Sequence, residues 1–170
     1  VTPDRTRVTS PAEDIDWPSL SRLIIVACGT ASYAGHVAKY WFEQLAGLPV
    51  ELDIASEFRY RDAPLDGTEA ALFISQSGET ADTLAALRYA NEHVKTTAAI
   101  VNVEESSIAR EVDIILPTLA GREIGVASTK AFTCQLMALV CTALLAARKR
   151  GRISAEDEAK AISQLAELPR

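Results

Sequence analysis

Residues 70 to 91 read AALFISQSGETADTLAALRYAN, and this segment decides the fold of the chain. Ala70 to Ile74 is a continuous apolar run, which is typical of a strand buried on both faces. Ala81 to Asn91 then has the apolar spacing of a helix. Between them, Ser75 to Thr80 places three hydroxyls and an amide at the turn from strand to helix. A strand, a tight turn and a helix form the repeating unit of parallel α/β sheets.

The turn from Ser75 to Thr80 has the chemistry of an anion site. The first N–H groups of a helix have no partner within the helix, and the helix dipole is positive there, so a phosphate can be held without Arg or Lys. Gly78 allows a close backbone approach or a positive φ. Ser77 or Thr80 could instead simply cap the helix. Glu79 suits the dipole but would repel a phosphate unless its side chain points away.

Strand and helix patterns alternate along the rest of the chain. Further strands are expected at Leu23 to Ala27, Val50 to Ile54, Thr97 to Val103 and Asp113 to Leu116, and helices at Tyr33 to Ala46, Ala55 to Tyr60, Ser106 to Val112, Lys130 to Arg150 and Ser154 to Leu168. This alternation predicts the α/β class, with a doubly wound five-stranded parallel sheet flanked by helices on both faces.

The predicted topology brings two hydroxyl-bearing turns together. In the flavodoxin-like strand order 2-1-3-4-5, the order reverses between the first and third strands, and ligands bind beyond the carboxyl ends of the strands at that point. The turns after those two strands are Cys28-Gly29-Thr30-Ala31-Ser32 and Ser75 to Thr80. The sheet does not need Ser or Thr in either turn, so their meeting favours phosphate binding over capping. A dinucleotide fingerprint is excluded because Ala31 and Ala34 stand where its second and third glycines belong.

Composition limits the remaining classes of function. The chain has 170 residues, 48% of them hydrophobic, which suits one globular domain. A net charge of −6 and a pI near 5.0 argue against a nucleic-acid partner. Three cysteines without metal spacing and the lack of a signal pattern predict a cytoplasmic protein with reduced thiols and no metal. The uncharged stretch from Ala131 to Ala147 is expected to be a buried helix, not a membrane span.

The chain is expected to have three parts. Residues 1–21 are polar, carry three prolines and show no periodicity, so they are interpreted as a linker or arm. Residues 22–150 form the domain, and residues 151–170 form a C-terminal helix. Within the domain, Thr118 to Thr129 is a long loop of the kind that is usually functional. Lys130, in the first turn of the next helix, either is solvated or faces an anion or a carboxylate such as Glu123.

Four motifs in order then identify a resemblance. They are A-C-G-T at residues 27–30, A-S-E-F-R-Y at 55–60, S-Q-S-G-E-T-A-D-T at 75–83 and E-I-G-V-A-S-T-K-A-F at 123–132. With this spacing the chain resembles the glucosamine-6-phosphate synthase family, the isomerising glutamine:fructose-6-phosphate aminotransferases. The similarity covers about residues 22 to 150 and is to the first of two sugar-isomerase (SIS) subdomains.

The resemblance implies a sheet that binds the phosphate of fructose 6-phosphate or glucosamine 6-phosphate, in the synthesis of amino sugars as UDP-N-acetylglucosamine precursors. No cofactor is implied. Phosphate contacts are implied for Ser75, Gln76, Ser77, Thr80 and Thr30, and sugar contacts for Cys28, Gly29, Val126 and Ser128. The chain departs from the family at Ala31, where a serine is usual. Its backbone N–H can still contact the phosphate.

The resemblance also implies partners. A glutaminase domain would precede Val1, and a second SIS subdomain with the isomerase residues would follow Arg170. The chain alone is therefore expected to be inactive. The helix from Lys130 to Arg150 is apolar nearly all round, so we expect it to pack against another SIS unit, in a homodimer or against the sister subdomain. The alternative interpretation is a stand-alone, non-enzymatic phosphosugar-binding module with a regulatory role.

Overall fold

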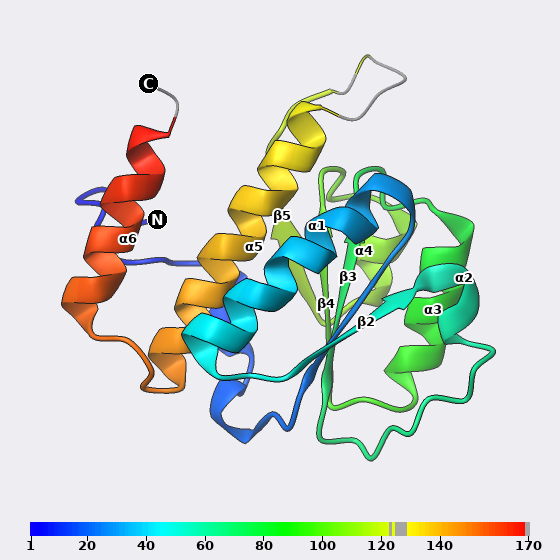
Figure 1. Cartoon of the computed structure of the whole chain (residues 1–170). Coiled ribbons are helices and arrows are strands. Elements are labelled where there is room, and N and C mark those ends of the chain that lie inside the picture. Colours follow the sequence, from blue (N-terminus) through cyan, green and yellow to red (C-terminus); the bar gives the residue numbers. More distant parts are fainter. Residues whose placement is uncertain (123, 125–128, 169–170) are drawn as a thin grey trace.

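The computed structural model describes residues 1–122, 124 and 129–168. Its sheet contains five parallel strands in the order β2-β1-β3-β4-β5, flanked by helices on both faces (Figure 1). The strands are β1 (Leu23–Ala27), β2 (Val50–Ile54), β3 (Ala70–Ser75), β4 (Thr96–Val101) and β5 (Ile114–Pro117). The helices are η1 (Pro11–Asp14), η2 (Trp17–Ser19), α1 (Gly29–Trp41), η3 (Phe42–Ala46), α2 (Ala55–Phe58), α3 (Ala81–Asn91), α4 (Ser107–Glu111), α5 (Lys130–Lys149) and α6 (Ala155–Glu167). The predicted α/β class and strand order are confirmed.

Two hydrophobic cores lie on the two faces of the sheet. Alternate residues of each strand, such as Ile25 and Leu72, pack with α1 and α5. The intervening residues, such as Val26 and Phe73, pack with the helices α2, α3 and α4. Every residue of β1 and β3 is buried, because helices cover these central strands on both sides. The sheet thereby holds the carboxyl ends of β1 and β3 side by side, with Ala27 paired in register with Ile74.

Helix α1 begins one turn earlier than the sequence predicted. The expected start was Tyr33, but the helix starts at Gly29, whose φ is +56°. The predicted turn is therefore the first turn of the helix, since nothing between Gly29 and Tyr33 prevents helical geometry. The helix lies close to the sheet at Gly35, where an added Cβ would come within 2.9 Å of Ile25 Cγ2. Gly47, with φ +58°, ends the helical segment as expected.

Residues 1–21, expected to be a linker or arm, pack in part against the domain. Five of their apolar side chains are buried in the core beside α1 and α5: Val8, Ala12, Ile15, Trp17 and Leu20. The Trp17 ring stacks on Phe42 with 5.9 Å between the ring centroids. The backbone N–H of Val8 donates to the buried carboxylate of Glu158 at 2.9 Å. The apolar residues of this segment follow no regular period, so their burial could not be read from the pattern.

Helix α5 is the long apolar helix of the domain. Among the described residues it is the one helix whose length and composition would suit a membrane span. Half of its apolar window is buried inside the domain, and it packs beside α1 on one face of the sheet (Figure 1). The core helix of a soluble domain has the same composition, so this placement agrees with the buried helix that the sequence predicted.

Candidate anion-binding site

The turns after β1 and β3 meet in a crevice of about 250 Å³ at the carboxyl end of the sheet. Ten residues line it: Cys28, Thr30, Ala31, Ile74, Ser75, Gln76, Ser77, Thr80, Thr83 and Gln135. Seven of the ten site residues predicted from the sequence are among them. Gly29 lies between two lining residues at the start of α1, while Val126 and Ser128 lie outside the described residues. The volume is below the roughly 300–1,000 Å³ of a complete ligand pocket, so the crevice can hold only part of a sugar phosphate.

The turn after β3 is shaped by its own hydroxyl groups. Ser75 Oγ accepts a hydrogen bond from the N–H of Gly78 at 3.0 Å, and it lies 3.3 Å from Thr80 Oγ1. Ser77 Oγ accepts from the N–H of Glu79 at 3.1 Å. Gly78 adopts φ +67°, a conformation in which glycine is favoured. These bonds bend the backbone so that the turn leads directly into α3.

The first turn of α3 is left open to a ligand. Thr80 is the N-cap residue, yet no side chain makes a cap hydrogen bond there. The idea that Ser77 or Thr80 simply caps the helix is therefore wrong. The backbone N–H groups of residues 80–83 have no acceptor in the described part of the chain. An anion in the crevice would satisfy such groups and would also meet the positive end of the dipole.

Other helices of the same domain have the caps that α3 lacks. Helix α1, which also starts at the crevice, has no side-chain cap. In contrast, Ser106 caps α4 by accepting from the N–H of Ala109, and Ser154 and Asp157 form a capping box on α6. Side-chain caps are thus present on α4 and α6, whereas α1 and α3, which start at the crevice, have none, and neither do α2 and α5.

Glu79 points away from the crevice. Its carboxylate accepts hydrogen bonds from the N–H of Ser107 at 2.8 Å and from the Ser107 hydroxyl at 2.7 Å. These bonds lower the pKa of Glu79 below its ordinary value, so the group stays ionised. The N–H of Ile108 also donates to the carbonyl of Gly78 at 3.0 Å. The start of α4 therefore braces the turn, and the carboxylate that could have repelled a phosphate is directed elsewhere.

Sequence reasoning missed three lining residues, the apolar Ile74 and the polar Thr83 and Gln135, and the two polar ones bear on ligand binding. They approach the crevice from opposite faces of the sheet, Thr83 from α3 and Gln135 from α5. Their side chains are buried, with relative exposures of 1% and 3%. A Thr one turn after Thr80 and a single amide in an uncharged apolar helix are signals that could have pointed to them.

The loop after β5 is held near the crevice by Asn102. The Asn102 carboxamide accepts from the hydroxyl of Thr118 at 3.0 Å and from the N–H of Ala120 at 2.8 Å, and it donates to the carbonyl of Gly121 at 2.8 Å. Lys130 Nζ donates to the carbonyl of Arg122 at 2.6 Å. The cation in the first turn of α5 thus contacts a backbone oxygen, while Glu123, one of its expected partners, lies outside the described residues.

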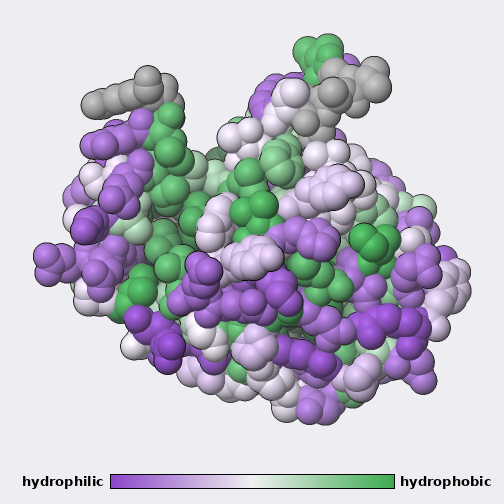
Figure 2. Space-filling view, in the orientation of Figure 1, coloured by the Kyte–Doolittle hydropathy of each residue, from purple (hydrophilic) through white to green (hydrophobic). Residues whose placement is uncertain are grey.

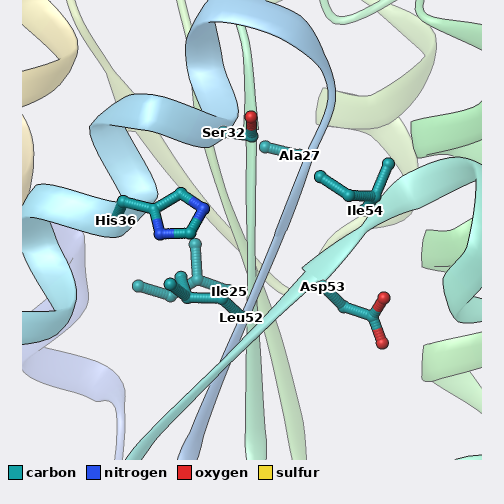
Figure 3. A pocket seen from close by; sticks show the side chains of 7 residues that line it. All are labelled: Ile25, Ala27, Ser32, His36, Leu52, Asp53 and Ile54. Atoms are coloured by element: carbon teal, nitrogen blue, oxygen red, sulfur yellow. The ribbon is translucent and has the colours of Figure 1, made fainter.

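A second cavity, also of about 250 Å³, lies at the edge strand β2 beside α1 (Figure 3). Ser32, His36 and Asp53 are among its lining residues, which suggests a catalytic triad. However, the Ser32 hydroxyl donates to the carbonyl of Gly29 at 2.7 Å. The Asp53 carboxylate points away from His36 and pairs with Arg61 (Figure 3). The three side chains therefore do not form a catalytic triad.

Fold and crevice together define a class, the doubly wound α/β domains with a ligand crevice at the switch point of a parallel sheet. The match of the SIS domain family to residues 19–145 is more specific, and the chain belongs to that family.

Known proteins similar to the chain include aminotransferases. It is 62% identical over 165 residues to a glutamine–fructose-6-phosphate aminotransferase (isomerizing) from Bradyrhizobium diazoefficiens, and 59% identical over 156 residues to one from Bartonella quintana. These alignments cover 96% and 92% of the chain but 27% and 26% of the relatives. The chain therefore spans about a quarter of the length of the curated relatives it matches.

Solved structures agree with this placement. The C-terminal domain of glucosamine-fructose-6-phosphate aminotransferase from Francisella tularensis superposes with a TM-score of 0.89 at 41% identity, over 95% of this chain and 46% of that one. Glucosamine-6-phosphate deaminase from Thermotoga maritima superposes with a TM-score of 0.70 at 26% identity, over 84% of this chain and 44% of that one. The resemblance inferred from the four motifs is confirmed.

Proposed function

We propose that this chain is the sugar-phosphate-binding part of a glutamine:fructose-6-phosphate aminotransferase, and that it holds the phosphate of fructose 6-phosphate or glucosamine 6-phosphate. The observation that carries the proposal is the uncapped start of α3. The backbone N–H groups of this helix start have no acceptor in the described structure, and the Thr80 hydroxyl, which contacts only Ser75 Oγ at 3.3 Å, lines the crevice beside them. The relatives' names supply the identity of the sugar phosphate.

Phosphate binding here would depend on hydrogen bonds and the helix dipole. No Arg or Lys is among the residues that line the crevice. The donors would be the hydroxyls of Ser75, Ser77 and Thr80, the Gln76 amide, and the N–H groups at the starts of α1 and α3. On the α1 side, Thr30 would add a hydroxyl and Ala31 a backbone N–H. Cys28 and Gly29, together with Val126 and Ser128 from the family motif, would lie along the sugar.

Calorimetric titration with fructose 6-phosphate tests the site, with unphosphorylated fructose as the ligand control. Thr80→Val keeps the shape of the side chain and deletes one hydroxyl, so we expect affinity to fall by about 10- to 150-fold, equivalent to about 1.5–3 kcal/mol for a bond to a charged group. Thr142→Val is the matched control, because the Thr142 hydroxyl donates to the carbonyl of Ala138 outside the crevice. Equal affinities for wild type and Thr80→Val would overturn the site.

The partner surface is proposed on α5 and α6. A groove of about 530 Å³ between them is lined by Met137, Cys141, Ile162 and Leu165, together with residues at the N-terminus. Figure 2 shows hydrophobic side chains along this hollow. In the whole enzyme we propose that another SIS unit, either the sister subdomain or a second copy in a homodimer, contributes the rest of the sugar site. Sedimentation velocity at high micromolar concentration tests self-association.

Catalysis is proposed to need the rest of the enzyme. The relatives are about four times longer than the chain, and the family resemblance implies that the glutaminase and isomerase residues lie in their other parts. We therefore expect the 170-residue chain to bind a hexose 6-phosphate in the cytoplasm without converting it. Formation of glucosamine 6-phosphate by the pure chain, lost in Thr80→Val, would contradict this expectation.

A further inference from the structure

The side chain of Gln135 is the most unusual group in the crevice. It projects from the second turn of α5 and is 97% buried, at 3% relative exposure. Its carboxamide makes no hydrogen bond to any residue of the described chain, although it lines the crevice. A buried amide is normally paired, because removal from water without a partner is costly. A group that the fold leaves unpaired at a ligand crevice is suited to pair with the ligand.

We propose that the Gln135 carboxamide binds the phosphorylated ligand directly, with its N–H₂ group donating to an oxygen of the bound sugar phosphate. This inference rests on the proposed function of the crevice. A phosphate presents mainly acceptor oxygens, and the crevice lining contains no cationic side chain. A neutral donor at this position adds a hydrogen bond without adding a charge that must be desolvated.

The position of Gln135 gives the contact a second consequence. Helix α5 packs with α1 on one face of the sheet, whereas α3 packs on the opposite face. A ligand that contacts both Gln135 and the turn from Ser75 to Thr80 would be held from both sides of the switch point. The hydroxyls of that turn are partly used by backbone N–H groups of the turn itself, but the Gln135 amide is unused. It is therefore a preformed ligand contact that is open to the crevice.

A loss of affinity without a loss of stability distinguishes this role from a structural one. Gln135→Leu replaces the amide side chain by an apolar one of similar volume. We expect its affinity for fructose 6-phosphate to fall by about 10- to 150-fold. The unfolding temperature of the ligand-free protein should not fall, because the amide has no hydrogen bond in the described chain to lose. Thr142→Val changes a residue of the same helix whose hydroxyl is already hydrogen-bonded. Its affinity for fructose 6-phosphate should equal that of wild type.

Titration calorimetry and thermal melts of wild type, Gln135→Leu and Gln135→Glu carry the test. Glu keeps the shape but lacks the N–H₂ donor, so it should bind at least as weakly as Leu, and it provides the measurement if the Leu variant does not fold. If wild type binds and both variants bind equally well, the role of Gln135 is overturned while the proposed function stands. If wild type does not bind fructose 6-phosphate, both the role of Gln135 and the proposed function are overturned. Reduced stability with unchanged affinity would assign Gln135 a structural role and overturn the inference.

Discussion

Gly78 provides a quantitative test of how the phosphate turn is built. Its φ of +67° is unfavourable for any L-residue with a Cβ, and for Ala this conformation costs about 1–2 kcal/mol. A Cβ at this position would also lie 2.5 Å from the Cβ of Ser106, far inside van der Waals contact. Ser106 is 1% exposed, and its hydroxyl caps α4, so it cannot move without breaking that cap. Overpacking of this kind adds about 1–3 kcal/mol.

Gly151 is the matched control for Gly78→Ala. It has the same φ of +67°, but an added Cβ would meet nothing within 4 Å. Gly151→Ala should therefore show only the conformational cost of about 1–2 kcal/mol, whereas Gly78→Ala should cost about 2–5 kcal/mol. Equilibrium urea unfolding measures both, and an unchanged m-value allows the midpoints to be compared directly.

The difference between the unfolding free energies of the two variants measures the contact between the turn and α4. Equal free energies of unfolding for Gly78→Ala and Gly151→Ala would refute the close packing of Gly78 on Ser106. Binding provides a second readout, since only Gly78→Ala displaces the turn from Ser75 to Thr80. Its affinity for fructose 6-phosphate should fall, while that of Gly151→Ala should equal wild type.

Three further changes have defined outcomes. Ala31→Ser adds a hydroxyl at the crevice, so calorimetry should show tighter binding of fructose 6-phosphate by about 2- to 10-fold, equivalent to about 0.5–1.5 kcal/mol, and weaker binding would contradict the site. Glu158→Ala leaves Arg148, 17% exposed, with only Glu13 as ionic partner and removes the buried acceptor of the Val8 N–H. It should therefore cost about 3–5 kcal/mol in urea unfolding, and a loss under 1 kcal/mol would refute the contribution of these buried contacts. Hydrogen bonds from Ser107 lower the pKa of Glu79, so the stability they provide is complete above about pH 4.5 and is lost as the pH falls through the folded-state pKa. Between about pH 6 and about pH 3, the unfolding temperature should therefore fall more steeply for wild type than for Glu79→Gln. Parallel plots of unfolding temperature against pH would contradict this linkage.

Most of the fold could be predicted because its signals are local. The apolar runs of β1 and β3 and the helix-ending Gly47 each depend on a few neighbouring residues. The alternation of strands and helices then leaves few topologies, and the observed order agrees with the predicted one. The meeting of the two hydroxyl-bearing turns followed from that order alone.

Contacts between distant residues could not be predicted from the same patterns. The direction of Glu79 depends on Ser107, 28 positions away, and the burial of the first residues depends in part on a bond from Val8 to Glu158, 150 positions away. Local propensity contains no information about such pairs.

The sequence by itself determined the class of the fold, the order of its strands and the hydroxyls and N–H groups at the switch point. Tertiary structure decided which of these groups are free. Thr80 is uncapped, Glu79 is directed to α4, and Gln135 reaches the crevice from a helix more than fifty residues further along the chain. The physical reason is that the sequence gives the type of each polar group, whereas its freedom to bind a ligand depends on all the donors and acceptors that packing places around it.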